Sequence, residues 1–290
     1  MPFILNNIHK IYLRQIGLFL ILLAWLLGHN AFAIAGILTI EIKTSVTIEG
    51  DLLKVDVTAT NRGNEPAYNV QIHSIVLDEK KSGPIKNQLT VDQSDTVVFK
   101  RALSGAKKGR HPLIVLVDFY DANQYPFSAV SCTTFYFKED INPDLVCLGN
   151  DTSIEDNGLL SFKIKNLELS SRNIQATLIL PKELSTPNQK VDLKIDPRAE
   201  KMVSFDIHNF SALSGATYPA FCYFEYDLGD THYTAVAGVS VTILKNKDFF
   251  KRTKWRWVMV TVILILIPII MSIRNRGKSK VFNRKGKGNE

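Results

Sequence analysis

Three cysteines are the most reactive side chains in the 290-residue sequence. Cys147 and Cys222 stand where the first half of the chain, aligned with the second, has the apolar residues Ile40 and Val115. Two thiols in place of two apolar residues are expected to point into one core, and an oxidising compartment joins such a pair as a disulfide. The alternative is two buried free thiols that pack as small apolar groups. Cys132 has no base nearby in the sequence and is expected to be structural.

Carboxylates recur at equivalent places in the two halves of the chain, Asp118 with Asp121 in the first and Glu225 with Asp227 and Asp230 in the second. Clustered carboxylates in a loop can bind calcium through their oxygens. Asp beside Gly in a hairpin is more often turn chemistry, and the spacing matches no dedicated calcium loop. We therefore expect turns here and no metal site.

The histidines of the presumed globular part are scattered, and no two of them have the spacing of metal ligands (His73, His111, His208 and His232). The second half has Tyr218 where the first has His111, which predicts a packing role for both rings. No nucleophile elbow, phosphate-binding glycine loop or zinc motif occurs. The sequence thus predicts a protein that is not an enzyme, with no catalytic residue, cofactor or small-molecule ligand.

The first half of the globular part is repeated in the second at an offset of about 106 residues. Residues 111–119 align with 218–226, 127–130 with 233–236, and 50–53 with 157–160. A repeat of this length is a whole domain, because solenoid units are much shorter. A β-sandwich takes roughly 100 residues, so the offset favours two copies of that fold.

Polar and apolar residues alternate in both copies, as in residues 54–58 and 161–165, which is the pattern of half-buried strands. Residues 113–120 and 220–226 are almost continuously apolar and predict central strands covered on both sides. Neither repeat shows convincing helical periodicity. We predict an all-β fold class: two tandem immunoglobulin-like β-sandwiches, over residues 36–140 and 141–244, plus one C-terminal transmembrane helix. The short linker at residues 138–143 predicts sandwiches placed end to end.

The N-terminal residues 1–33 have the pattern of a secretory signal peptide. Lys10 and Arg14 precede an apolar run at residues 16–27, and Ala31 and Ala33 offer a cleavage site. The long basic region before the run leaves an uncleaved anchor as the alternative.

Residues 257–273 carry no charge and predict a transmembrane helix. A basic juxtamembrane segment (residues 245–256) precedes this run and a basic tail (residues 274–290) follows it. Its expected anchors at the membrane interface are Trp255, Arg256, Trp257 and Arg274. Since the N-terminal signal exports the repeats, we expect a single-pass protein of the plasma or inner membrane, or of the ER membrane, with a cytoplasmic C-terminus.

Basic residues are concentrated at the membrane-flanking ends. Residues 245–290 hold 13 Lys and Arg against 2 acidic residues, whereas the two repeats together hold 20 against 26. A negatively charged globular part lacks the basic surface that nucleic-acid binding needs, so we expect no nucleic-acid partner. In a host that glycosylates secreted chains, Asn150 and Asn209 fit the acceptor pattern.

Residues 55–72, with Asn61-x-Gly63 and Pro66-Ala67, resemble the strand–turn–strand signature of CARDB-type, cell-adhesion-related immunoglobulin-like domains. The order of segments is similar in layout to the beta subunit of the translocon-associated complex. The first resemblance implies a binding or structural role and no catalytic residue.

From these observations we predict a membrane protein that presents two sandwiches outside the cytoplasm for protein–protein interaction or adhesion. Its partners are expected to be the lipid bilayer and one or more proteins. Two alternatives stay open: an accessory subunit of a secretion, translocation or envelope-assembly complex, and a glycan-binding module.

Overall fold

The computed structural model describes residues 38–244 of the chain. The signal peptide at 1–33, the basic segment at 245–256, the span at 257–273 and the tail at 274–290 lie outside the described residues, as do their anchors Trp255, Arg256, Trp257 and Arg274. Between residues 38 and 244 the chain is all-β, and it contains no helix that could cross a membrane.

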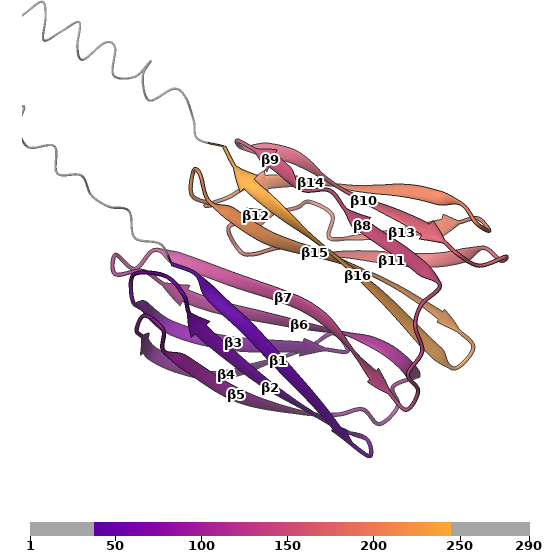
Figure 1. Cartoon of the computed structure of the whole chain (residues 1–290), viewed down its shortest axis with the longest axis horizontal. Helices are drawn as coiled ribbons and strands as arrows, with labels where there is room; N and C mark the ends of the chain where they lie inside the picture. The colour runs from indigo at the N-terminus through magenta and orange to yellow at the C-terminus, as the bar shows by residue number, and fades with distance from the viewer. Residues whose placement is uncertain (1–37, 245–290) are drawn as a thin grey trace, which may run out of the picture.

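The first half of the described chain packs two antiparallel sheets face to face (Figure 1). One sheet has the order β1-β2-β5 and the other the order β4-β3-β6-β7. The strands are β1 (Ile40–Glu49), β2 (Leu52–Asn61), β3 (Ala67–Val76), β4 (Glu79–Leu89), β5 (Ser94–Ala102), β6 (Lys108–Tyr120) and β7 (Pro126–Phe137).

The second half repeats this plan with two short additional strands, β9 and β12. One sheet has the order β12-β14-β10-β8, and the other runs β13-β11-β15-β16. The strands are β8 (Leu145–Gly149), β9 (Thr152–Ile154), β10 (Asn157–Asn166), β11 (Arg172–Ile179), β12 (Leu184–Ser185), β13 (Lys190–Ile195), β14 (Glu200–Asn209), β15 (Thr217–Leu228) and β16 (Thr231–Ile243).

Each half has its own hydrophobic core between its two sheets. Alternate residues of β2, such as Leu53 and Val55, point into the first core because successive side chains of a strand face opposite sides. Leu160 and Phe162 of β10 do the same in the second core. The predicted alternation is confirmed, and the fold is built of β-sandwich domains of immunoglobulin-like type.

A fully buried asparagine is the last residue of β2 in the first sandwich and of β10 in the second. Asn61 donates from Nδ2 to the backbone oxygens of Glu65 (2.8 Å) and Leu89 (3.0 Å), and its Oδ1 accepts from the backbone N–H of Gly63. Asn166 makes the same three bonds, donating to Ser170 and Asp196 and accepting from Glu168. The turn motif found in the first copy therefore has a structural counterpart in the second, although the sequence there lacks its glycine and proline.

The expectation of sandwiches placed end to end is wrong, because they lie side by side and run in opposite directions (Figure 1). The linker is held against the first sandwich by Lys108, which binds Glu139, and by Arg110, which binds Asn142. The second sandwich therefore folds back along the first. As a result, the start of β1 and the end of β16 lie at the same end of the molecule (Figure 1).

Candidate functional site

The two sandwiches meet at an apolar seam that is separate from both cores. Its buried members come from both halves of the chain (Ile114, Val130, Cys132, Ile179 and Tyr223), and Ile75, Leu116, Phe221 and Val236 pack against them. This contact explains why β6 and β15 are almost continuously apolar: one face of each strand lines its own core and the other lines the seam. The prediction that these strands are covered on both sides is confirmed.

The seam joins equivalent positions of the two copies. Ile114 and Leu116 of β6 align in the repeat with Phe221 and Tyr223 of β15, and all four belong to the seam. A surface that meets its own counterpart is the arrangement of a two-fold dimer interface, here within one chain.

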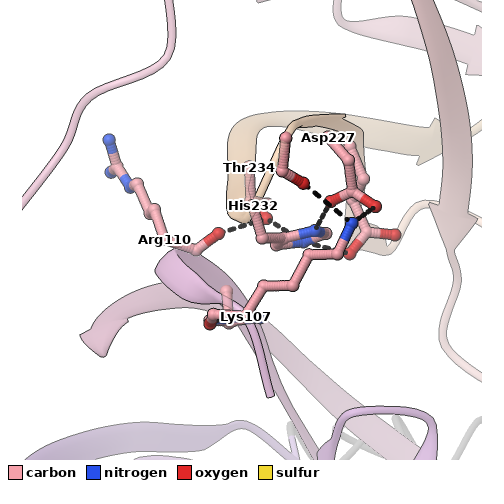
Figure 2. A network of polar contacts seen from close by, with 8 residues as sticks. Lys107, Arg110, Asp227, His232 and Thr234 are labelled. Atoms are coloured by element: carbon pink, nitrogen blue, oxygen red, sulfur yellow. Dashed lines mark hydrogen bonds and ion pairs between the residues drawn. The ribbon is translucent and has the colours of Figure 1, made fainter. Parts of the chain in front are cut away.

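A polar network closes the seam at the linker end (Figure 2). Lys107 of the first sandwich reaches Asp227 of the second, with 2.9 Å between Nζ and Oδ2. The Thr234 hydroxyl donates to the backbone oxygen of Arg110 at 2.8 Å. The two sandwiches also share a short parallel pairing, Thr231 with Lys108 and His232 with Gly109.

His232 is the centre of this network. Its Nδ1 lies 2.8 Å from Asp227 and its Nε2 lies 3.2 Å from Glu225, and its ring stacks on His111 with 4.5 Å between centroids. Burial lowers the pKa of His232, but the hydrogen bonds to the two carboxylates outweigh it and raise the pKa above its ordinary value. Burial lowers the pKa of His111, whose Nε2 donates to the backbone oxygen of Lys107. The two carboxylates therefore favour the cationic form of His232, whereas burial favours the neutral form of His111.

Thr234, His232 and Asp227 resemble a hydrolase triad in their connectivity, since Thr234 Oγ1 lies 3.2 Å from His232 Nε2. The arrangement does not suit nucleophilic attack, because Thr234 is fully buried and its proton is committed to the backbone oxygen of Arg110. These side chains are better suited to joining the sandwiches than to catalysis.

A second polar contact closes the opposite end of the seam. The carboxylate of Glu183, 1 % exposed, accepts from the backbone N–H and from the hydroxyl of Ser128, both at 2.7 Å. Burial raises the pKa of Glu183. Beside it, Lys182 pairs with Asp118 at 2.6 Å, and Asp118 also binds His73.

Of the carboxylates that the sequence groups into two acidic hairpins, Asp118, Glu225 and Asp227 bind partners across or beside the seam. Asp121 instead accepts from the backbone N–H groups of Asn123 and Tyr125, which is the turn chemistry expected there. A cavity of about 310 Å³ opens next to Lys107, His111, Glu225 and Asp227. Among residues 38–244, no group of three or more His, Cys, Asp or Glu side chains is placed to hold a metal ion.

The structure places the three cysteines as free thiols in different surroundings. Cys222 is fully buried in the core of the second sandwich, and Cys147 packs against that core from β8. Burial raises the pKa of Cys147 to about 12. Their oxidation to a disulfide stays a prediction, which mass spectrometry of unreduced peptides can test. Cys132 lies in the seam between the sandwiches, and burial raises its pKa to about 12.

The two glycosylation candidates differ in accessibility. Asn150 is exposed after β8. Asn209 is half-buried, and its Nδ2 donates to the backbone oxygens of Glu155 and Ala212. A glycan on Asn209 would replace one of the two Nδ2 protons and remove at least one of these bonds, so Asn150 is the more accessible acceptor.

The outer sheet of the second sandwich exposes a group of large apolar side chains, which we call the outer apolar face. Its members are Val146 (43 % exposed), Leu148 (60 %), Leu159 (58 %) and Met202 (52 %). Leu148 and Met202 lie opposite Lys163 of β10, one on each side. Within the described chain, β8 has one hydrogen-bonded neighbour strand, β10, so this apolar face reaches the edge of the sheet.

The corresponding sheet of the first sandwich is more polar, although Leu52 and Val98 are exposed on it. A row across it consists of Lys43, Thr58 and Thr96, and the next row consists of Ser45, Asp56 and Val98. Both sheets cover a core with their inner faces, so the difference between them lies in what they present to the surroundings.

The fold and the seam define a chain of joined immunoglobulin-like β-sandwiches. No protein-family model and no curated protein matches the chain. Among solved structures it is similar to red sea bream transglutaminase (12 % identity, 70 % of this chain and 31 % of that chain, TM-score 0.27). It is also similar to an Escherichia coli alpha-2-macroglobulin activated by porcine elastase (9 % identity, 73 % of this chain and 22 % of that chain, TM-score 0.28). The chain thus spans less than a third of the length of either protein.

Proposed function

We propose that this chain is a non-enzymatic, single-pass membrane protein that presents two rigidly joined sandwiches outside the cytoplasm to a protein partner. The observation that carries the proposal is the outer apolar face of the second sandwich. Large apolar side chains that gather on one exposed sheet favour a protein interaction site, whereas scattered ones need no explanation. Leu148 and Met202 lie on either side of Lys163, which pairs with Glu200, so the face combines exposed apolar side chains with a charged pair between them.

The edge of this sheet also suits a partner. Strand β8 contains no lysine and no proline, the residues that usually protect a free edge from pairing. The edge strand β4 of the first sandwich has both, with Lys80, Lys81, Pro84 and Lys86. A partner strand added beside β8 would gain backbone hydrogen bonds and contact Val146 and Leu148 at once.

The arrangement of the chain ends supports membrane anchorage. Because the start of β1 and the end of β16 lie at one end, both apolar segments of the sequence connect to the same end of the molecule. The opposite end then points away from the bilayer, and the outer sheets lie along the sides of the molecule. This layout, together with the CARDB-type resemblance, favours tandem immunoglobulin-like sandwiches with a cytoplasmic C-terminus, on a plasma, inner or ER membrane.

A photo-crosslinking residue in the full chain, in its native membrane, tests the docking face. Placed at Leu159, it is expected to capture one protein of defined mass, and at Lys43, on the polar sheet of the first sandwich, it is expected to capture none. The double variant Leu148→Ser, Met202→Ser should reduce the capture from position 159 by roughly tenfold, which corresponds to about 1.4 kcal/mol. Equal capture from positions 43 and 159, or capture that the double variant leaves unchanged, would refute the docking face.

The identity of the captured partner separates the remaining alternatives. A partner that is itself embedded in the membrane and copurifies in mild detergent at fixed stoichiometry favours the accessory subunit. A partner on another cell or surface favours adhesion. If external protease leaves the sandwiches of sealed vesicles intact while it trims the tail, the proposed orientation is wrong.

One observation favours glycan binding as a second candidate. A shallow hollow of about 450 Å³ lies beside the edge strand β13, lined by polar groups of Asn173, Gln175, Asp192 and Lys194. Amide and carboxylate side chains around an open hollow can bind sugar hydroxyls. Binding to a glycan array that Asp192→Ala abolishes would support this function, and binding that this variant leaves unchanged would reject the hollow as the site.

A further inference from the structure

Exposed apolar side chains also gather at the end of the molecule where the described chain begins and ends. We call these residues the apolar end: Tyr125 (38 % exposed), Phe210 (78 %), Leu213 (46 %) and Leu244 (43 %). Tyr125 belongs to the hairpin between β6 and β7, Phe210 and Leu213 to the loop between β14 and β15, and Leu244 follows β16. Figure 1 shows these three segments at one end.

Hydrogen bonds hold these segments together. The Tyr125 hydroxyl donates to the backbone oxygen of Ser211 at 2.9 Å, which links the hairpin of the first sandwich to the loop of the second. The Ser214 hydroxyl donates to the backbone oxygen of Leu244, and the N–H of Gly215 donates to that of Ile243. The apolar end is therefore a built surface that spans both sandwiches.

We propose that the apolar end rests in the interfacial layer of the lipid bilayer, with the Phe210 side chain inserted between the headgroups. This inference rests on the membrane anchorage proposed above. Phenylalanine, tyrosine and leucine on a connected surface are the residues that enter the headgroup region of a membrane.

The length and charge of the chain outside the structure point to lipid as the occupant. Residues 245–256 separate Leu244 from the apolar run at 257–273, and twelve residues span at most about 40 Å. Six of these twelve residues are Lys or Arg. Each basic residue near an anionic membrane surface is attracted by about 1 kcal/mol, so the segment draws the end of β16 toward the headgroups.

The turn at the opposite end of the second sandwich supplies a matched control. Leu169, between β10 and β11, is 77 % exposed and so equals Phe210 in exposure and in apolar character. It lies at the end from which β11 starts, away from the end of β16 (Figure 1). A general affinity of exposed apolar side chains for lipid would affect both positions alike, whereas an oriented contact affects only Phe210.

The test uses the full chain reconstituted in vesicles of phosphatidylcholine with phosphatidylglycerol. Single variants Phe210→Cys and Leu169→Cys are labelled with an environment-sensitive fluorophore, and the parent chain reports any labelling of the native thiols. Spin-labelled lipids in the vesicles then quench the fluorescence of any label that lies close to them. The label at 210 is expected to lose roughly half of its emission, since interfacial apolar groups lie about 5–10 Å into the boundary layer. The label at 169 is expected to keep its emission.

Each other outcome overturns a defined claim. If the chain does not float with the vesicles, the proposed membrane anchorage fails. If it floats and the labels at 210 and 169 are quenched equally, or the label at 210 not at all, the membrane contact of the apolar end fails while the anchorage stands. If the label at 210 is unquenched and the unlabelled Phe210→Cys chain is joined to a second copy by a thiol-reactive crosslinker, the apolar end is a self-association surface.

Discussion

The two sandwiches share one plan inside and differ outside. Sheet order matches from β1-β2-β5 to β8-β10-β14 and from β4-β3-β6-β7 to β13-β11-β15-β16, and Asn61 and Asn166 close equivalent strands with the same bonds. The outer sheet is mostly polar around Lys43 and Thr58 in the first copy, whereas in the second it exposes Leu148 and Met202 on either side of Lys163. The core pattern and the buried asparagine specify the fold, and the exposed residues carry whatever distinguishes the two copies.

A third surface is common to both copies and exists only because they are joined. Equivalent residues of β6 and β15 face one another across the seam, and charged contacts such as Lys107 with Asp227 and Lys182 with Asp118 close its two ends. An apolar centre with a polar rim is the usual anatomy of a stable interface. Residues 38–244 therefore form a single joined unit and not two modules on a flexible linker.

The strongest test of the shared interior compares Asn61→Ala with Asn166→Ala. Each change removes three hydrogen bonds and leaves buried backbone groups unpaired, at about 1–3 kcal/mol per group, so each should reduce stability by roughly 3–5 kcal/mol. Thermal unfolding of the solubilised chain measures both, with Asn150→Ala as an exposed control. A large loss for Asn61 and none for Asn166 would show that the two copies are not equivalent inside.

Gly109→Ala is expected to break the seam while both cores stay folded. The glycine has φ +120°, and a Cβ there would lie 2.1 Å from the backbone oxygen of His232 in the other sandwich. Overpacking costs about 1–3 kcal/mol and backbone strain a similar amount. Hydrogen exchange should rise at the paired ends of β6 and β16, with the circular dichroism unchanged.

Gly50→Ala is the control, since its φ is also positive, +60°, but no atom lies within 4 Å of a Cβ there. If hydrogen exchange were equal in the two variants, the seam would not depend on the close approach of Gly109 to His232.

The strands and their inward faces could be predicted from the sequence, because alternation along residues such as 54–58 and 161–165 reports directly on one buried face. Near-continuous apolar runs also predicted that β6 and β15 are covered twice. What covers them could not be predicted, because a strand's composition records burial and not the partner.

The polar ends of the seam were beyond prediction for a related reason. Lys107 and Asp227 stand 120 positions apart, and Ser128 and Glu183 stand 55 apart, and neither spacing belongs to a local motif. The acidic hairpin and His232 were visible as residues, but their partners His111 and Lys107 come from the other sandwich. The end-to-end expectation was wrong because a short linker limits distance but not direction.

The pH dependence of stability distinguishes the seam from the cores. The folded state raises the pKa of His232 above its unfolded value of about 6.5. The stabilisation that His232 adds to the folded state is therefore fully present below the unfolded pKa and is lost as the pH rises through the folded pKa. Relative to the parent, His232→Gln should be less stable by roughly 1–2 kcal/mol at pH 5.5, as expected for hydrogen bonds to charged groups, and by less at pH 8.5. His73, which does not contact His232, remains in both proteins, so its opposite trend cancels. His208→Gln, at an exposed position, is the control. If His232→Gln lost the same stability at both pH values, the raised pKa of His232 would be contradicted.

The smallest expected effect concerns the outer apolar face. Leu148→Ser and Met202→Ser should each change the free energy of unfolding by no more than about 0.5 kcal/mol, because exposed side chains away from the core contribute little to folding. Lys43→Ser on the polar sheet of the first sandwich should do the same. Urea unfolding of the full chain in detergent measures the three variants side by side. If the apolar variants were destabilised while Lys43→Ser was not, Leu148 and Met202 would belong to the folding of the second sandwich, and the contrast between the two outer sheets would no longer point to a partner.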